Sequence, residues 1–354
     1  MNTVLAALVA RTGDSGLESY GVSAPVSCVL LTPRFRASRH VVFLIFPRGA
    51  ADPALVAKVP RLAGDTSGVD RERVVLTAAQ DAREGGYATI PRIVAYEELS
   101  GMAILVESAL VGLPLTPERV RRDPSGAIAA VLAWLEELPS SETSVYQERF
   151  VRLIEDPLSR FGSALGREAS ELVGRTLELL EPLREFPLPA VVEHGDLSHP
   201  NLLSLRSGQI GVVDWELAHF EGFPTHDLFF FVNFVSAALA RASTPDQQVR
   251  ALHDALIRPT GWARDIVSTY ALRMGIEHRY LAPLLVACFG RYTAGVFGRL
   301  GGSAGIGGPP DRYPRDRSDA SREAELARMI RADRHYALWQ HAVAYVDELA
   351  WTKG

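Results

Sequence analysis

The sequence predicts an α+β protein of two lobes, with a small β-rich amino-terminal lobe and a larger, mostly helical carboxy-terminal lobe. At about 150 residues per domain, a chain of 354 residues is long enough for two lobes. Short aliphatic and β-branched runs between turn-rich segments dominate the first part of the chain, and helical periodicity dominates after Gly112. We therefore place the lobes at residues 1–111 and 112–354.

Composition and charge exclude several classes of protein. Hydrophobic residues make up 47% and charged residues 22%, as in an ordinary globular protein. A formal net charge of −5 argues against general nucleic-acid binding. Two cysteines, Cys28 and Cys288, are too few for a disulfide framework or a cysteine zinc site. We expect them to be reduced.

The location predicted from the sequence is cytoplasmic. No positive charge precedes the apolar stretch at the amino terminus, so this stretch is predicted to be an amphipathic helix and not a secretory signal. The most apolar later run, residues 228–240, is shorter than the roughly 20 residues that a membrane helix needs. We expect neither a nucleic-acid nor a membrane partner.

The first lobe is predicted to contain an antiparallel meander, one helix and two further strands. The helix covers residues 69–83, where apolar side chains recur at helical spacing and Asp70 is the expected cap. The predicted strands are residues 28–31, 41–46, 55–59, 93–96 and 102–107.

The second lobe is predicted to be helical except for a strand region at residues 191–213. Pro157 is expected to cut the second helix short, because proline lacks an N–H group. Residues 301–320 are rich in glycine, proline, aspartate and arginine and predict a flexible loop. The predicted helices are residues 125–138, 149–161, 168–183, several from 227 to about 299, and 321–351.

The strand region contains the residues on which a functional prediction depends. Two aliphatic runs, 202–205 and 210–213, flank a Ser-Gly turn and predict a hairpin. This hairpin would bring the loop that holds Asp196 and Asn201 beside Asp214. Magnesium prefers oxygen ligands, usually one or two carboxylates with water and phosphate, so Asn201 and Asp214 are predicted magnesium ligands. Asp196 is the predicted base that accepts a proton from a substrate hydroxyl.

The wording of this region resembles that of a known family. His194-Gly-Asp196-Leu-Ser-His-Pro-Asn201-Leu-Leu, followed by Val-Val-Asp214-Trp-Glu216, is similar to the motifs of the aminoglycoside phosphotransferases, relatives of choline kinase. The resemblance covers residues 20 to 300, approximately. It implies a bilobal protein-kinase-like fold and transfer of the γ-phosphate of ATP (or GTP), with Mg²⁺, to a hydroxyl of a small molecule.

The resemblance also implies a nucleotide site in the first lobe. Lys58, in a Val-Ala-Lys-Val strand, corresponds to the family lysine that holds the phosphates, and Glu72 on the next helix corresponds to its partner. Glu84 is a rival to Glu72. The aliphatic strand that ends at Glu107 corresponds to the adenine-binding hinge, with Ala109 beyond it.

The phosphate-covering loop departs from the family pattern. Residues 32–39 contain no glycine, and Ser38 or an arginine is the expected replacement for backbone contacts to phosphate. This departure keeps a second hypothesis open, a nucleotide-binding regulatory module without transfer activity. A protein kinase is disfavoured, because only ten residues separate Glu216 from Asp227 and leave little room for a peptide platform.

Several nearby residues have two interpretations. His194 belongs to the predicted catalytic set, and orienting the loop is its expected role rather than carrying a proton. Asp227, in an Asp-Leu pair that matches the family, is expected to cap a helix and anchor the loop. Glu216 would either bind a second metal or hydrogen-bond the loop.

The acceptor is expected to enter from the helical lobe. The sequence does not distinguish an aminoglycoside, a sugar, a nucleoside or another natural product as the acceptor. The histidines of the region do not have the spacing of a closed zinc set. The aromatic run Phe229–Phe231 with Phe234 is predicted to be core packing.

Overall fold

The structure is a computed structural model that describes residues 22, 26–32, 40–62, 64–99, 101–141, 146–301 and 319–349. Three predictions lie outside the described residues: Ser38 with most of its loop, the opening helix, and most of the predicted flexible loop at 301–320.

Contacts between residues divide the chain into two compact units. The β-rich unit consists of Met1–Leu115 and Pro200–Phe220, and the helical unit consists of Thr116–His199 and Glu221–Gly354. The hairpin predicted from the sequence therefore joins the amino-terminal unit, although it follows the first helices in the chain. The domain limits proposed above, 1–111 and 112–354, stay a prediction.

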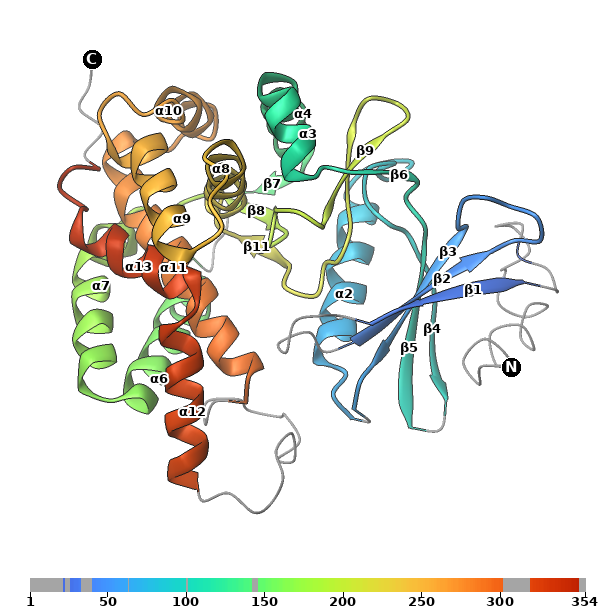
Figure 1. Ribbon diagram of the computed structural model, residues 1–354, viewed down its shortest axis with the longest axis horizontal. Helices are drawn as coiled ribbons and strands as arrows, with labels where there is room; N and C mark the ends of the chain where they lie inside the picture. The colour runs from blue at the N-terminus through green and yellow to red at the C-terminus, as the bar shows by residue number, and fades with distance from the viewer. Residues whose placement is uncertain are drawn as a thin grey trace. The chain divides into compact units, whose positions relative to one another are not determined.

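An antiparallel sheet with the strand order β1-β2-β3-β5-β4 forms most of the β-rich unit (Figure 1). The predicted meander and the two later strands are confirmed. The strands are β1 (Ser27–Leu31), β2 (His40–Phe46), β3 (Leu55–Pro60), β4 (Ile93–Leu99) and β5 (Met102–Ser108).

Alternation along these strands separates two layers. Phe43, Ala57 and Val106 belong to a core on one face of the sheet. Leu105 and Val69 pack together on the other face, where helix α2 (Ser67–Asp81) contacts β3, β4 and β5. Successive side chains of a strand point to opposite faces, so Lys58 of β3 lies on the α2 face.

The cap of α2 differs from the prediction. Its N-cap residue is Thr66, and Asp70 lies inside the first turn. The Asp70 carboxylate accepts hydrogen bonds from the hydroxyl groups of Thr66 and Tyr96. A carboxylate in the first turn still interacts favourably with the positive end of the helix dipole.

The predicted hairpin is confirmed. Strands β9 (Leu202–Leu205) and β10 (Ile210–Val212) pair antiparallel, and β6 (Gly112–Pro114) adds a third strand beside β9. The Val212 N–H donates to the Thr89 carbonyl at 2.9 Å, which ties the hairpin to the segment between α2 and β4.

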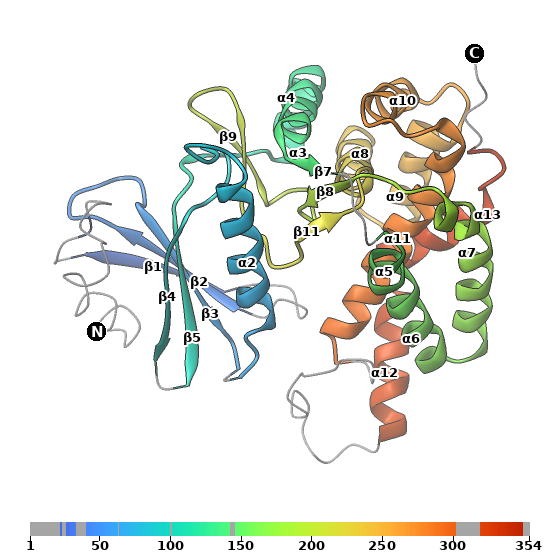
Figure 2. The same ribbon diagram turned by 180° about the vertical axis from the view of Figure 1, so that it is seen from behind.

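The helical unit is built around helix α11, which is buried along most of its length and contacts α6, α7, α8 and α13 (Figure 2). A small sheet has the order β11-β8-β7. The helices are α3 (Pro117–Arg122), α4 (Pro124–Glu137), α5 (Tyr146–Phe150), α6 (Asp156–Leu165), α7 (Arg167–Glu185), α8 (His226–Leu239), α9 (Pro245–Leu252), α10 (Arg264–Arg273), α11 (Leu281–Arg299), α12 (Asp319–Arg331) and α13 (Arg334–Ala344), and the strands are β7 (Ser140–Ser141), β8 (Ala190–Glu193) and β11 (His219–Gly222).

Two helix predictions were wrong in detail. The helix near 149–161 does not stop before Pro157, because a π-helical turn (Val151–Glu155) leads into α6 and Pro157 lies in the first turn of α6. At that position a missing N–H is tolerated. The predicted helix 321–351 is two helices. Asp333 separates them and caps α13 by accepting the His335 N–H at 2.8 Å.

Among the described residues, one helical segment is long and apolar enough to cross a membrane, His278–Arg299. Within its apolar window 78% is buried inside the protein, where it forms the centre of the helical unit. The cytoplasmic location stays a prediction.

A buried ion pair links β8 to α11. The Arg291 guanidinium donates from Nη2 to Glu193 Oε1 at 2.9 Å and from Nη1 to Oε2 at 3.0 Å. The Phe223 N–H also donates to Glu193 Oε2 at 2.7 Å. Glu193 is 1% exposed and Arg291 is 9% exposed, so neither charge is hydrated. Each therefore depends on the other.

We expect Arg291→Met to lower the free energy of unfolding by about 3–5 kcal/mol, because it leaves the Glu193 carboxylate buried without its cation. Urea unfolding measures this loss. Arg273→Met removes an arginine whose pair with Glu136 is solvent-exposed, and should cost less than about 1 kcal/mol. Equal losses in the two variants would contradict a structural role for the buried pair.

Candidate active site

The loop from His194 to Asn201 follows β8 and is held at its start by one carboxylate. Asp227, in the first turn of α8, accepts the His194 N–H at 2.7 Å and the Gly195 N–H at 2.9 Å. Gly195 has a φ of +84°, which only glycine adopts without strain. The predicted anchoring role of Asp227 is therefore confirmed, whereas the N-cap of α8 is Thr225.

Burial has a clear effect on the anchor. Asp227 is 4% exposed. Burial of the carboxylate raises the pKa of Asp227 to about 7, and the nearby Glu193 carboxylate adds to this shift. Hydrogen bonds from the two backbone N–H groups act in the opposite direction.

Asp196 lies half-buried in the middle of this loop. Its carboxylate Oδ1 accepts the Ser198 hydroxyl at 3.2 Å, and its N–H donates to His194 Nδ1 at 3.3 Å. His194 is fully buried. A ring nitrogen that accepts a backbone N–H orients the loop, which supports the positioning role expected for His194.

In the β-rich unit, Lys58 is surrounded by carboxylates. Its Nζ pairs with Glu72 at very short range and lies 3.4 Å from Glu107 Oε1 and 3.5 Å from Asp214 Oδ1. Burial by itself would lower the pKa of Lys58, but these carboxylates raise it well above its ordinary value. The surrounding carboxylates therefore favour the protonated form of the amine. The structure brings Lys58 to Glu72, and not to the rival Glu84.

Glu72 also joins the lysine to the segment that follows the hairpin. The Trp215 N–H donates to the same Glu72 oxygen, Oε1, at 2.7 Å. Glu72 is completely buried, and Trp215 is buried beside it. One carboxylate thus connects α2, β3 and the residue next to Asp214.

The predicted hinge is more complex than an adenine-binding strand end. The Glu107 side chain is 1% exposed and points to Lys58. Burial raises the pKa of Glu107 to about 8, with Lys58 opposing the shift and Glu72 adding to it. The Ala109 N–H donates to the Ala54 carbonyl at 2.9 Å. The group that Ala109 can offer to a purine is therefore its carbonyl oxygen.

The two predicted magnesium ligands are neighbours across the hairpin. The backbone carbonyl of Asn201 accepts a hydrogen bond from the N–H of Val213, the residue before Asp214, at 3.0 Å. Asp214 has a φ of +70°, an unfavourable conformation for a residue with a side chain. Its carboxylate is 37% exposed and lies within ion-pair distance of Lys58, so it does not point into an apolar interior.

One residue at this point, His40, was not among the site residues predicted from the sequence. His40 is the first residue of β2 and is 3% exposed. Its Nε2 lies 3.4 Å from Asp214 Oδ1 and its Nδ1 lies 3.1 Å from Glu216 Oε2. Burial favours the neutral ring, but contacts with Asp214 and Glu216 raise the pKa of His40 to about 10.

The carboxylates at this point fit a divalent cation, whereas a protonated His40 ring has no lone pair to offer as a ligand. Atoms of His40, Asp214 and Glu216 lie within 4.8 Å of one another. Carboxylate oxygens are the ligands that magnesium prefers, and the protonated His40 ring offsets the charge of both carboxylates here. Glu216, whose role the sequence left open, therefore belongs to the Asp214 cluster.

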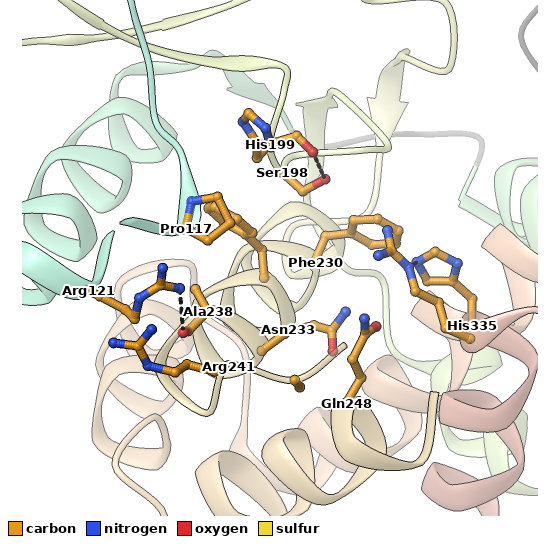
Figure 3. Close-up of a pocket in the computed structure, with 14 residues that line it drawn as sticks. Pro117, Arg121, Ser198, His199, Phe230, Asn233, Ala238, Arg241, Gln248 and His335 are labelled. Atoms are coloured by element: carbon orange, nitrogen blue, oxygen red, sulfur yellow. Dashed lines mark hydrogen bonds between the residues drawn. The ribbon is translucent and has the colours of Figure 1, made fainter. Parts of the chain in front are cut away.

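The helical unit contains a cavity of about 360 Å³ beside the end of the Asp196 loop, where Ser198 and His199 line it (Figure 3). Phe230 and Phe234 also line this cavity. Phe229, Phe230 and Phe231 are buried as predicted, although Phe230 also borders the cavity, whereas Phe234 is only half-buried. Helical periodicity does not reveal which apolar positions border a cavity.

Comparison with known proteins identifies the family. Residues 36–265, more than half of the chain, match the model of the phosphotransferase enzyme family. The chain belongs to this family. No curated protein sequence matches the chain significantly. The match to the family model confirms the resemblance drawn from the His-Gly-Asp and Asp-Trp-Glu segments.

Solved structures show the fold of this family member. A choline kinase from Streptococcus pneumoniae has a TM-score of 0.50 at 10% identity, with 97% of this chain and 99% of that chain covered. For an ethanolamine kinase from Plasmodium vivax the TM-score is 0.50 at 11% identity, with 93% and 88% covered. An aminoglycoside phosphotransferase from Streptomyces rimosus has a TM-score of 0.45 at 17% identity, with 78% and 93% covered. The predicted α+β, kinase-like fold is confirmed.

We expect Asp227→Ala to lower the free energy of unfolding by about 2–4 kcal/mol, because it leaves two buried N–H groups of the loop without an acceptor. Equilibrium urea unfolding measures the change. Asp246→Ala, which removes an exposed carboxylate from the first turn of α9, should cost no more than about 1 kcal/mol. If Asp227→Ala lowered the free energy of unfolding by no more than Asp246→Ala does, other contacts would have to hold the loop.

Proposed function

We propose that this protein transfers the γ-phosphate of ATP or GTP to a hydroxyl group of a small molecule. The family and the fold support a small-molecule phosphotransferase. The observation that carries the finer proposal is the buried Lys58 amine, which contacts Glu72 and Asp214 together. Phosphoryl transfer needs fixed positive charge and fixed geometry more than it needs covalent chemistry.

In this proposal the β-rich unit binds the nucleotide. Lys58, held as a cation by Glu72, contacts the phosphates. The segment from Glu107 to Ala109 contacts the base, and Ser38 contributes to the phosphate-covering loop. Replacement of water by these fixed charges stabilises the negative charge that spreads over the transferred group.

Asn201 and Asp214 are the proposed magnesium ligands, and Glu216 lies close to Asp214. When bound, magnesium neutralises phosphate charge and orients the transferred group. The Asp214 carboxylate is 37% exposed, whereas the next residue, Trp215, is buried. Binding of the ion would have to compensate for the loss of the contacts that His40 makes with Asp214 and Glu216.

Asp196 is the proposed base. It would accept the proton of the acceptor hydroxyl while the oxygen attacks the γ-phosphorus and the bond to the β-phosphate oxygen breaks. Its hydrogen bond from Ser198 and its backbone contact with His194 fix the carboxylate in one orientation. His194 is proposed as a positioning residue for this carboxylate.

We expect Asp196→Ala to reduce kcat by about 10²–10⁴-fold, because general-base help is lost, while nucleotide affinity stays within about twofold. ADP release with a panel of hydroxylated acceptors and isothermal titration with nucleotide and magnesium measure the two quantities. Asp265→Ala is the control for loss of an exposed carboxylate in the helical unit.

Near-normal turnover in Asp196→Ala would remove Asp196 from the mechanism. Nucleotide binding by the unaltered protein without turnover on any acceptor would instead favour the regulatory module without transfer activity.

We expect Asp214→Asn to raise the magnesium concentration needed for half-maximal turnover by about tenfold or more, because a charged ligand becomes neutral. Asparagine tolerates positive φ, so the fold should be retained. Asp81→Asn, at the exposed end of α2, is the matched control. A magnesium titration of turnover makes the measurement, and an unchanged midpoint in Asp214→Asn would exclude Asp214 as a ligand.

A further inference from the structure

The cavity in the helical unit is lined by cations and by no carboxylate among its described residues. It lies between α3, α8, α9, the start of α13 and the end of the Asp196 loop. The charged lining residues are Arg121, Arg241 and Arg334. His199 and His335 also line it.

Two acidic groups outside the lining, Glu118 and Asp333, do not cancel the charge of its arginines. Glu118 pairs with Arg121 at 2.7 Å, but the Glu118 side chain is 68% exposed, and a pair in water contributes little. Asp333 lies 3.1 Å from His335 Nδ1 and caps α13. The side chains that line the cavity therefore carry a net positive charge, and the Asp196 carboxylate lies one hydrogen bond beyond them through Ser198.

Arg241 occupies a position that favours glycine. It follows the C-cap of α8 with a φ of +52°. Its N–H donates to the Ala238 carbonyl at 3.2 Å, and the next N–H, of Ala242, donates to Ala237 at 2.9 Å. This is the helix-ending motif in which glycine is usual. An arginine held there against the local preference, on a cavity wall, is a sign of function.

Arg121 converges on the same helix end. Its Nη1 donates to the Ala238 carbonyl at 3.1 Å (Figure 3). The side chain is thereby fixed in one orientation at the wall of the cavity. Arg121 and Arg241 thus provide guanidinium groups at one end of the cavity, where an anion would gain charge-assisted hydrogen bonds.

Asn233 supplies a second, independent sign of a ligand. It is 6% exposed, and its Oδ1 has no hydrogen-bond partner in the part of the chain that the structure describes. In Figure 3 its amide faces that of Gln248 across the cavity. A buried acceptor without a donor is rare in proteins, and a ligand hydroxyl would satisfy it.

The cavity is also connected to the proposed base. Ser198 lines the cavity, and its hydroxyl donates to the Asp196 carboxylate at 3.2 Å. A ligand seated here is therefore one hydrogen bond from Asp196.

We propose that this cavity is the acceptor site and that the acceptor is a hydroxylated small molecule carrying an anionic group, a carboxylate or a phosphate. This inference rests on the proposed transfer function. Arg121 and Arg241 hold the anion, and Asn233 accepts a hydroxyl. A polycation such as an aminoglycoside, or a choline-like cation, would meet arginines where it needs carboxylates.

The experiment compares gluconate, glucose and glucosamine, which share a carbon skeleton and differ in charge, together with inorganic phosphate. Binding is measured by isothermal titration without nucleotide, at constant ionic strength set with sodium chloride. The test variant is Arg241→Gly, in which glycine suits the positive φ and should preserve the fold. Arg250→Gln, on an exposed face of α9, removes the same charge outside the cavity.

We expect gluconate and inorganic phosphate to bind, and glucose and glucosamine to bind at least about tenfold more weakly. Arg241→Gly should weaken binding of the anions by about tenfold, and Arg250→Gln by less than about twofold. Gluconate without phosphate binding would indicate a carboxylate acceptor, and the reverse would indicate a phosphorylated one. Tighter binding of glucosamine, no anion binding, or equal anion affinity in Arg241→Gly would overturn the inference.

ADP release with the same compounds separates this inference from the proposed transfer. Anion binding that depends on Arg241, without ADP release on any acceptor, would support the anionic site and count against transfer. Phosphorylation of glucosamine with no phosphorylation of gluconate would do the opposite.

Discussion

The rest of the β-rich unit depends on one buried carboxylate, that of Glu72. It accepts a hydrogen bond from the Lys58 amine and another from the Trp215 N–H. A cation and an anion removed from water are stable only together. Glu72 therefore holds α2, β3 and the segment after the hairpin together. As a consequence, the Asp214 carboxylate lies beside Lys58.

In the helical unit, buried carboxylates likewise hold the loop that begins at His194. Glu193 with Arg291 fixes the end of β8 against α11, and Asp227 fixes the first two N–H groups of the loop that follows. Asp196, the next residue, is thereby presented by two buried interactions that do not involve it. Rigid support of this kind, with the Asp196 carboxylate itself left half-exposed, suits the proposed role of Asp196 as a base that must be oriented and still reach a substrate.

Charge distinguishes the two halves of the proposed chemistry. Around Lys58 the protein places an excess of carboxylates, so a cation such as magnesium would be favoured there. Around the cavity lined by Arg121 and Arg241 it places cations without a lining carboxylate. Family membership alone does not reveal this difference, because related folds accommodate acceptors of different charge.

Local residue patterns were sufficient to predict the strands of this protein and the family that it resembles. Short aliphatic and β-branched runs predicted every strand of the main sheet. The wording of the segments around Asp196 and Asp214 resembled that of the family. Contacts between residues far apart in the chain became visible only in the folded structure. His40 became a partner of Asp214, Glu107 turned toward Lys58, and Phe230 and Phe234 came to border a cavity with Arg241. These outcomes depend on which side chains are removed from water together, and residues far apart in the chain give no local signal of it.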